Sequence, residues 1–292
     1  MPAIETKISP ASADFQKNRE DMLAEVQRFR DVEAKVHATE ESKREKFHGR
    51  GQLLPRERVH LLLDRGSPFL ELSTLCGYKH HDDKDGSLAG GNSIIGIGYV
   101  SGVRCMISAS NSAVKGGTMT PFGVQKTLRI QEIALKQKLP VISLIESGGA
   151  NLLYQAEVFI PGGKTFANQA RLSAAGIPQV TVVHGSSTAG GAYMPGLSDH
   201  VIMVRKKAKV FLAGPPLLRA ATGEIAEDED LGGAEMHCQV AGTTEVIAAD
   251  ASDGITFARA VVTKLGWNTT PAKPEPTPLG APRSPAQEPS PP

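Results

Sequence analysis

The chain has 292 residues, 40% of them hydrophobic and 5% aromatic, which is enough for one large domain or two small ones. Its 32 Lys and Arg residues are balanced by 31 Asp and Glu residues, so the composition argues against a nucleic-acid partner. No apolar run approaches a membrane span, and the scattered Cys76, Cys105 and Cys238 provide neither a disulfide framework nor a zinc site. We therefore expect a cytoplasmic enzyme, or one of the mitochondrial matrix, with no membrane contact and no metal.

The N-terminal part of the chain is expected to be helical after a disordered start at 1–14. Residues 15–50 are strongly charged, and their apolar residues recur at roughly helical spacing, which predicts an amphipathic helix lying over another element. These apolar residues are Phe15, Met22, Val26, Phe29 and Val36. A second short helix followed by an extended segment is expected within 53–72, and residues 77–92 are typical of a polar loop.

From residue 93 onward, short β-forming runs alternate with helical patterns. Strands are expected at 93–100, 104–110, 139–146, 177–183, 200–205 and 209–214. Helices are expected at 121–138, 151–159, 163–176, 188–197 and 252–267. This order predicts an α/β fold with a core sheet over a domain of residues 15–268. Residues 269–292 are rich in proline and have little to bury, so we expect a linker or tail there.

Two of the expected strands end in the same unusual way. The runs "VISLIESGGAN" (141–151) and "VVHGSSTAGGAY" (182–193) each pass from β-forming residues through small polar ones to Gly-Gly-Ala, and "MISASNSAVKGGT" (106–118) is a looser version. Glycine lets a ligand approach the backbone closely, and the first amides of a helix have no intrahelical partner. We expect the two turns to be neighbours that present N–H groups to one oxyanion, such as the enolate of a thioester.

Other interpretations of these glycines remain open at this point. The G-x-G-x-x-G pattern of a dinucleotide site and the G-x-x-x-x-G-K-[ST] pattern of a phosphate loop are both absent. The run "GSSTA" (185–189) lacks only the final glycine of a nucleophile elbow, which would make Ser187 the nucleophile of a serine hydrolase and His200 or His237 its base. Tight packing of strand against helix, without a ligand, is the remaining alternative.

Seven motifs together resemble one family. They are "LLDRGSPFLEL", "VKGGT", "LRIQEIA", "ESGGANL", "GSSTAGGAYMPGLSD", "VFLAGPPLLRAATGE" and "DLGGAEMHC". In this order, between about residues 20 and 268, they resemble the carboxyltransferase (β) subunits of biotin-dependent acyl-CoA carboxylases, and most of all the 3-methylcrotonoyl-CoA and geranyl-CoA enzymes. The resemblance implies a crotonase-type α/β fold, a spiral of ββα units, with an N-terminal helical extension.

The resemblance also implies roles for particular residues. The thioester oxygen would be held by backbone amides from two sets, Gly148, Gly149 and Ala150 on the first turn and Gly190, Gly191 and Ala192 on the second. Contacts with CoA and its acyl group are expected from Lys115, Gly116, Gly117, Tyr193 and Phe211. Biotin, carried on a partner protein, would deliver the carboxyl group and take up the substrate proton, so no side-chain base is required.

Three further candidates have competing interpretations. The basic run 205–207 is more typical of solvated surface than of a site for CoA phosphates. The cluster 80–83, "HHDD", has a metal-binding composition, but its setting in a polar loop favours solvated charge. Glu146 is expected either to orient the first glycine turn or to cap it.

Members of the family form their active site between the first crotonase-like domain of one subunit and the second domain of a neighbour, and only the first domain is readable in this sequence. The expected partners are therefore acyl-CoA, a second carboxyltransferase domain from another chain, a biotin carboxylase or carrier (α) subunit, and further copies of the chain. Two alternatives stay open. One is a truncated or split-subunit domain that binds acyl-CoA without turnover alone, and the other is a subunit of a related decarboxylase.

Overall fold

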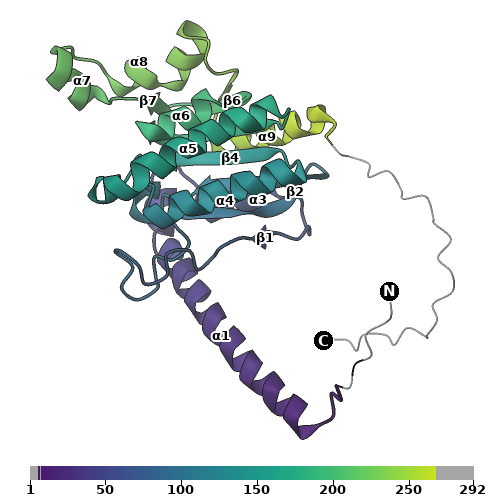
Figure 1. Ribbon diagram of the computed structural model, residues 1–292. Coiled ribbons are helices and arrows are strands. Elements are labelled where there is room, and N and C mark those ends of the chain that lie inside the picture. The colour runs from purple at the N-terminus through teal and green to yellow at the C-terminus, as the bar shows by residue number, and fades with distance from the viewer. Residues whose placement is uncertain (1–5, 7, 268–292) are drawn as a thin grey trace.

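The computed structural model describes Thr6 and residues 8–267, and that part of the chain contains one sheet of eight strands (Figure 1). The strands are β1 (Leu70–Glu71), β2 (Ser93–Val100), β3 (Val103–Ser110), β4 (Val141–Ser147), β5 (Gln179–Thr188), β6 (His200–Val204), β7 (Lys209–Phe211) and β8 (Val246–Ala248). Their order is β1-β2-β3-β4-β5-β6-β8, with β7 off this path against β5. The pairs among β1, β2 and β3 are antiparallel, and all later pairs are parallel, so the parallel strands end at one edge of the sheet.

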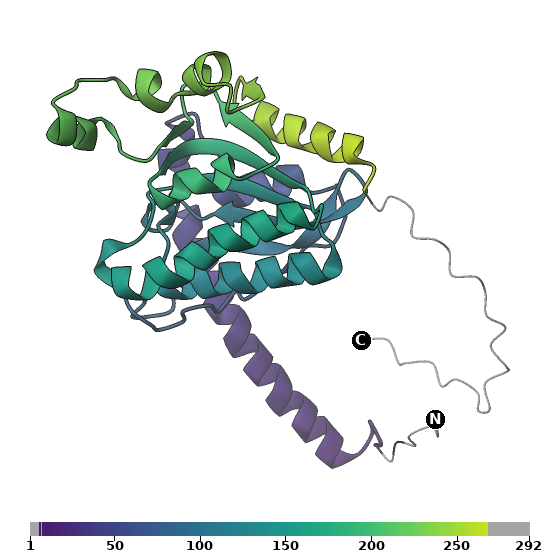
Figure 2. The ribbon, with the colours of Figure 1, turned by 45° about the horizontal axis from the view of Figure 1, so that its top comes forward.

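Helices cover both faces of the sheet (Figure 2). They are α1 (Ala13–Glu41), α2 (Arg44–His48), α3 (Pro55–Leu62), α4 (Pro121–Gln137), α5 (Gln155–Ala174), α6 (Gly190–Gly196), α7 (Pro215–Thr222), α8 (Asp228–Gly232) and α9 (Ala251–Leu265), with the one-turn helices η1 (Lys115–Gly117), η2 (Leu152–Tyr154) and η3 (Met236–Val240). On one face, Ile130 of α4 and Leu172 of α5 share a core with Met106. On the other, Leu62 of α3 and Ile255 of α9 belong to one buried cluster. The predicted α/β fold is confirmed.

Strand β5 meets different partners along its length. Its residues 180–183 pair with β6, whereas residues 186–188 pair with β7. On its other side, the register with β4 shifts between Ile145 and Ser147, because Ile145 lies opposite Val183 and Ser147 lies opposite Ser187. A single residue of β4, Glu146, therefore faces three residues of β5, and this bulge sets how far each strand reaches at the edge where both end.

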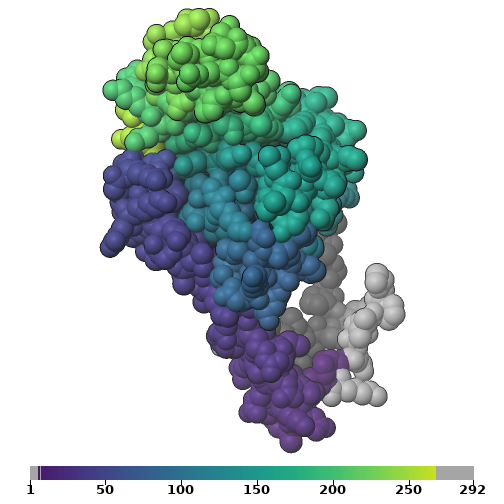
Figure 3. Space-filling model, turned by 90° about the vertical axis from the view of Figure 1, so that its left-hand side faces the viewer, coloured from purple at the N-terminus to yellow at the C-terminus, as the bar shows by residue number. Residues whose placement is uncertain are grey.

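The N-terminal helix differs from the prediction. Helix α1 begins at Ala13 and projects away from the domain instead of lying over it (Figures 1 and 3). Met22 and Phe29, predicted to be on a buried face, are 64% and 44% exposed, and Val36 is the first buried apolar residue. The contacts of α1 with the body lie in its C-terminal part, where Lys35 Nζ donates to Asp85 O and Glu40 bonds Arg56. Apolar spacing predicted the helix correctly but did not reveal where its partner surface ends. No helix among residues 8–267 is long and apolar enough to cross a membrane.

Two other stretches also differ from expectation. The helices expected at 151–159 and 163–176 form one continuous helix, α5, with Pro161 in its interior. Proline removes one backbone donor from the helix, but buried residues on both sides of it, Val158 and Thr165, keep the helix packed. Residues 212–240, for which no element was expected beyond the strand end, contain α7, α8 and η3. Helix α7 protrudes from the sheet (Figures 1 and 2), whereas Glu229 of α8 and His237 of η3 bond residues of β7.

Candidate active site

The two glycine turns lie side by side at the edge where the parallel strands end. β4 leads into residues 148–150, and β5 leads into α6. A Cβ atom placed on Gly149 would lie 3.2 Å from the carbonyl oxygen of Thr188. One placed on Gly191 would lie 3.6 Å from Cβ of Ser147. The structure therefore places the two turns in contact, as the repeated strand endings predicted.

The looser third strand ending, after β3, joins the same surface. The N–H of Gly148 donates to the carbonyl oxygen of Gly116 (3.2 Å), and the N–H of Met119 donates to the carbonyl oxygen of Gly149 (2.8 Å). Gly117 has a φ of +65°, and a Cβ there would lie 2.5 Å from the carbonyl oxygen of Glu146, so no other residue fits without movement. Three strand endings thus form one continuous backbone surface.

Only half of the predicted amides are free to donate. Those already used belong to Gly148, Gly149 and Ala192, which donate to Gly116 O, Ser147 Oγ and Ala189 O. Among the described residues, the predicted amides without a protein acceptor are those of Ala150, Gly190 and Gly191. One free N–H therefore comes from the first turn and two from the second, at the start of α6, where helical amides lack partners.

The second turn holds a strained residue. Ala189 has φ +51° and ψ −119°, a combination that L-residues rarely adopt and that costs about 1–3 kcal/mol. Its N–H donates to the carbonyl oxygen of Phe211 in β7 (3.1 Å), which holds the turn in place. Strain of this kind clusters at functional sites, where it fixes the direction of neighbouring amides.

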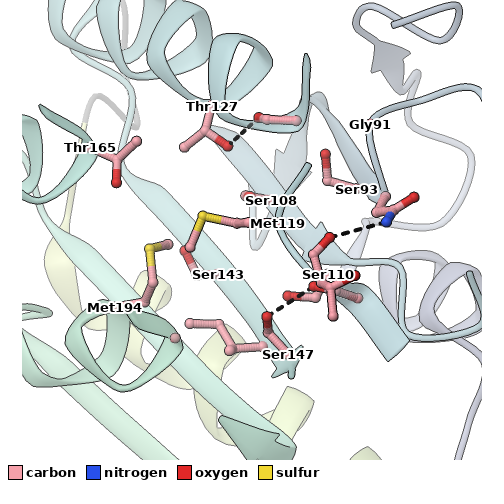
Figure 4. A pocket seen from close by; sticks show the side chains of 16 residues that line it. Gly91, Ser93, Ser108, Ser110, Met119, Thr127, Ser143, Ser147, Thr165 and Met194 are labelled. Atoms are coloured by element: carbon pink, nitrogen blue, oxygen red, sulfur yellow. Dashed lines mark hydrogen bonds between the residues drawn. The ribbon is translucent and has the colours of Figure 1, made fainter. Parts of the chain in front are cut away.

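A narrow cavity of about 70 Å³ lies beside the turns (Figure 4). Ser143 and Ser147 of β4 line it together with Met119 and, from α6, Met194. Ser147 Oγ donates to the carbonyl oxygen of Gly117 (2.9 Å) and so ties β4 to the turn after β3. The cavity therefore places small hydroxyl groups and two flexible thioether side chains beside the glycine turns.

The serine hydrolase hypothesis is wrong. Ser187 is fully buried, and its Oγ donates to the carbonyl oxygen of Gly191 (2.9 Å) rather than to a base. His237 contacts Val210 O and Thr243 Oγ1, each at 2.7 Å. His200 begins β6 and so lies at the opposite edge of the sheet from the turns. No histidine in the described chain is therefore hydrogen-bonded to Ser187.

Among protein families, the sequence model of the carboxyl transferase domain matches residues 46–290 of this chain. The chain belongs to the carboxyl transferase family. A probable biotin-dependent acyl-coenzyme A carboxylase beta2 subunit of Mycobacterium tuberculosis is 51% identical over 84% of this chain and 45% of its own length. A probable mitochondrial methylcrotonoyl-CoA carboxylase beta chain of Drosophila melanogaster is 44% identical over 91% of this chain and 46% of its own length. The geranyl-CoA carboxylase beta subunit of P. aeruginosa, whose crystal structure is known, is 60% identical in sequence to this chain. The two structures superpose with a TM-score of 0.85 over 93% of this chain and 51% of the P. aeruginosa chain.

This carboxyl transferase domain has the crotonase fold predicted from the motifs. The chain spans about half the length of the curated relatives it matches. The two glycine turns, the strained Ala189 and the cavity all lie within the residues that the family model covers.

The side chains that the resemblance assigns to CoA or acyl contacts surround the turns of this carboxyl transferase domain. Lys115 begins η1, and its Nζ forms an ion pair with Asp82. The ring of Tyr193 stacks on that of Phe166, with centroids 4.9 Å apart. Phe211 is half-buried in β7, where its carbonyl oxygen accepts from Ala189. The structure thus brings these residues to the same edge as the glycines.

A basic groove borders the first turn on the outer side. It is lined by Gly148 and Gly185, by Glu146, and by five cationic side chains, those of Lys43, Lys46, Arg50, Lys115 and Lys207. Of the predicted basic run, Lys207 reaches the groove and donates to Arg50 O (2.7 Å), whereas Arg205 pairs with Glu235. Three of these cations, Lys43, Lys46 and Arg50, were not predicted to contact CoA, because only folding brings residues 43–50 to the strand ends.

A buried ion pair beneath the groove was missed by sequence analysis. Arg58 of α3, only 1% exposed, donates through Nη2 to Glu146 Oε2 (2.6 Å). Burial lowers the pKa of Arg58, and the negative charge of Glu146 opposes that effect. His184 of β5 is also fully buried, and burial together with the charge of Arg58 lowers its pKa well below 6.5, so its ring is neutral. Arg58 lies in an ordinary-looking amphipathic helix, which gave no signal of this role.

The loop 77–92 is more ordered than its polar sequence predicted. The buried Asp83 accepts from the backbone N–H groups of Lys79, Gly86 and Leu88. Asp82 accepts from Tyr154 Oη (2.8 Å) as well as from Lys115. The prediction of solvated charge was therefore wrong for Asp83. Within the described residues, no three His, Cys, Asp or Glu side chains lie together as a metal site.

Proposed function

We propose that the chain is the acyl-CoA-binding half of a biotin-dependent acyl-CoA carboxyltransferase, with a 3-methylcrotonoyl-like thioester as its substrate. The observation that supports this most is the presence of amides without a protein acceptor on two touching turns, those of Ala150, Gly190 and Gly191. The thioester carbonyl oxygen would accept from both turns. Because the amides are fixed before the ligand arrives, they stabilise the negative charge that develops as the substrate becomes an enolate.

The remaining parts of the thioester have places near these turns. The acyl group would enter beside Met119 and Met194, and the basic groove would receive the phosphates of CoA through electrostatic attraction. Biotin, when bound on its carrier, supplies the carboxyl group and the nitrogen that takes up the substrate proton. We assign no residue of this chain to the biotin rings, because the second carboxyltransferase domain would supply that side of the site.

The partners proposed for this chain follow from that division. The second carboxyltransferase domain, from another chain, would supply the biotin side, and a biotin carboxylase or carrier subunit would deliver carboxybiotin. Exposed apolar side chains flank the candidate site and suit such contacts: Leu152, Leu153 and Ile160 near the start of α5, and Leu212 and Leu217 near α7, are each at least 60% exposed. We also propose that the chain assembles with further copies of itself.

The decisive experiment measures binding and turnover separately. Calorimetry with the purified chain should show binding of 3-methylcrotonoyl-CoA. Decarboxylation of 3-methylglutaconyl-CoA in the presence of free biotin should occur only after a second carboxyltransferase domain is added. Binding that never leads to turnover with that domain would favour a binding module, and turnover without biotin would favour a decarboxylase. Absence of thioester binding would contradict the proposal.

Reversing two charges in the groove should weaken binding of the CoA part. With Lys43→Glu and Lys46→Glu together, we expect about tenfold weaker binding of 3-methylcrotonoyl-CoA, or roughly 1.4 kcal/mol, and a smaller loss of affinity as salt is added. The matched control is Lys17→Glu with Arg19→Glu, which places the same change on the projecting part of α1. Equal effects of the two pairs in a calorimetric salt series would show that the groove has no special role.

A further inference from the structure

The bulge between β4 and β5 is filled by one charged side chain. Glu146 lies opposite residues 184–186 of β5, at the point where the register shifts. A Cβ placed on Gly185 would lie 2.6 Å from Cγ of Glu146 and 2.8 Å from its Oε1, so the carboxylate rests directly against the backbone of β5. Glycine at 185 leaves the space that this carboxylate occupies.

The same carboxylate connects three other segments. Glu146 Oε2 accepts from Arg58 Nη2 (2.6 Å) and from Ser112 Oγ (2.8 Å), and Oε1 accepts from Gln52 Nε2 (3.2 Å). Arg58 belongs to α3, Ser112 follows β3, and Gln52 precedes α3. One side chain thus joins the N-terminal extension to the ends of β3, β4 and β5, two residues before the first Gly-Gly pair begins to turn.

Within the described residues, no second carboxylate contacts Arg58 in place of Glu146. Arg58 is 1% exposed, and its Nε and Nη1 have no hydrogen-bond partner among the described residues, so Glu146 provides its only counter-charge contact. Both ring nitrogens of the buried His184 are equally without a partner in that part of the chain. A guanidinium held by a single ion pair depends on that pair for its position.

We propose that Glu146, held by Arg58, is a positioning residue that fixes the bulge and thereby the separation of the two glycine turns. The inference rests on the proposed function, because it concerns the same oxyanion-binding amides. It goes beyond that function in assigning their alignment to the ion pair between Glu146 and Arg58. It also gives the N-terminal helical extension a role in the site, since Arg58 comes from α3.

The test compares two ligands on the purified chain by calorimetry. One is CoA, which uses only the groove, and the other is a CoA thioether ending in a nitroalkane, whose nitronate anion imitates the enolate. In Glu146→Gln, which keeps the shape and loses the charge, we expect the nitronate to lose at least about tenfold more affinity than CoA, because misaligned amides forfeit part of the 10²–10³-fold effect of an oxyanion donor. A purely structural role would weaken both ligands alike.

A second variant guards against loss of folding. Gly185→Ala keeps both charges but pushes a methyl group against the carboxylate, and it should show the same selective loss. Glu132→Gln, at an exposed ion pair on α4, is the matched control and should change neither affinity. If Glu146→Gln and Gly185→Ala each lose the same affinity for CoA and for the nitronate, or lose none, the inference is overturned while the proposed function stands. A wild-type chain that binds the nitronate no better than CoA would overturn both.

Discussion

Replacing Gly149 with valine should lower carboxyl transfer about 10²- to 10³-fold in the enzyme assembled with its second domain, as the loss of an oxyanion-hole donor typically does. Gly149 has a φ of +86°, which a β-branched residue does not tolerate, and its Cβ would lie 3.2 Å from the carbonyl oxygen of Thr188. Valine would therefore force the first turn away from the second and separate the Ala150 amide from those of Gly190 and Gly191.

The measurement is the steady-state rate with 3-methylcrotonoyl-CoA and carboxybiotin, together with the affinity for the thioester. Because the displaced amides act mainly on the developing negative charge, kcat should fall far more than the affinity. Gly163→Val is the control, since Gly163 is exposed on α5 and a Cβ placed there would have no atom within 4 Å. A Gly149→Val enzyme with undiminished kcat would refute the assignment of the turns.

The second large effect concerns Lys126, a lysine of α4 that is only 3% exposed. Its Nζ donates to the carbonyl oxygens of Gly90 (3.0 Å) and Ser93 (2.8 Å), and no carboxylate of the described residues contacts it. Burial lowers the pKa of Lys126 from 10.5 to about 8, an effect that the charge of Glu71 partly offsets. Below pH 8 the folded protein must bury this charge, whereas above pH 8 it releases the proton.

The stability of the fold should consequently rise with pH in a defined window. Between pH 8 and 10.5 the unfolded chain binds the Lys126 proton and the folded chain does not, so the free energy of unfolding increases, by about 3 kcal/mol over the window. The difference in the free energy of unfolding between wild type and Lys126→Met isolates this effect, because the cysteines and other groups titrate in both proteins. Denaturant unfolding at several pH values gives that difference directly.

The matched comparison uses the same helix. Lys136 of α4 is exposed and pairs with Glu132. The difference in the free energy of unfolding between wild type and Lys136→Met should therefore stay constant from pH 8 to 10.5. A wild-type curve that runs parallel to that of Lys126→Met from pH 8 to 10.5 would mean that Lys126 keeps an ordinary pKa in the folded protein.

The glycine turns were predictable because their signals are local. A β-forming run that ends in Gly-Gly-Ala is visible in the letters, and its repetition indicated two neighbouring turns. Which amides stay free was not predictable, since the acceptors of Gly148 and Gly149 come from folding: Gly116 belongs to another strand ending, and Ser147 Oγ takes its direction from Gly117.

The long-range features of the site left no trace in local patterns. The partner of Glu146 is Arg58, far away in sequence on a helix whose apolar spacing looked ordinary. Helix α1 shows the reverse error, because its apolar residues repeat as they would on a buried face although most of that face contacts nothing in the described chain. The two helices expected at 151–159 and 163–176 form one, because packing of α5 on both sides of Pro161 keeps the helix continuous.

The divided pairing of β5 gives the second turn an anchor of its own at the end of the strand. Residues 180–183 are fastened to β6 in the core, while residues 186–188 are fastened to β7, whose last residue also holds Ala189. The strained turn therefore takes its position from a short strand near the periphery, whose Val210 packs against the core residues Val183 and Met203. The local geometry of the Gly190 and Gly191 amides is in this way tied to β7 as well as to the main sheet.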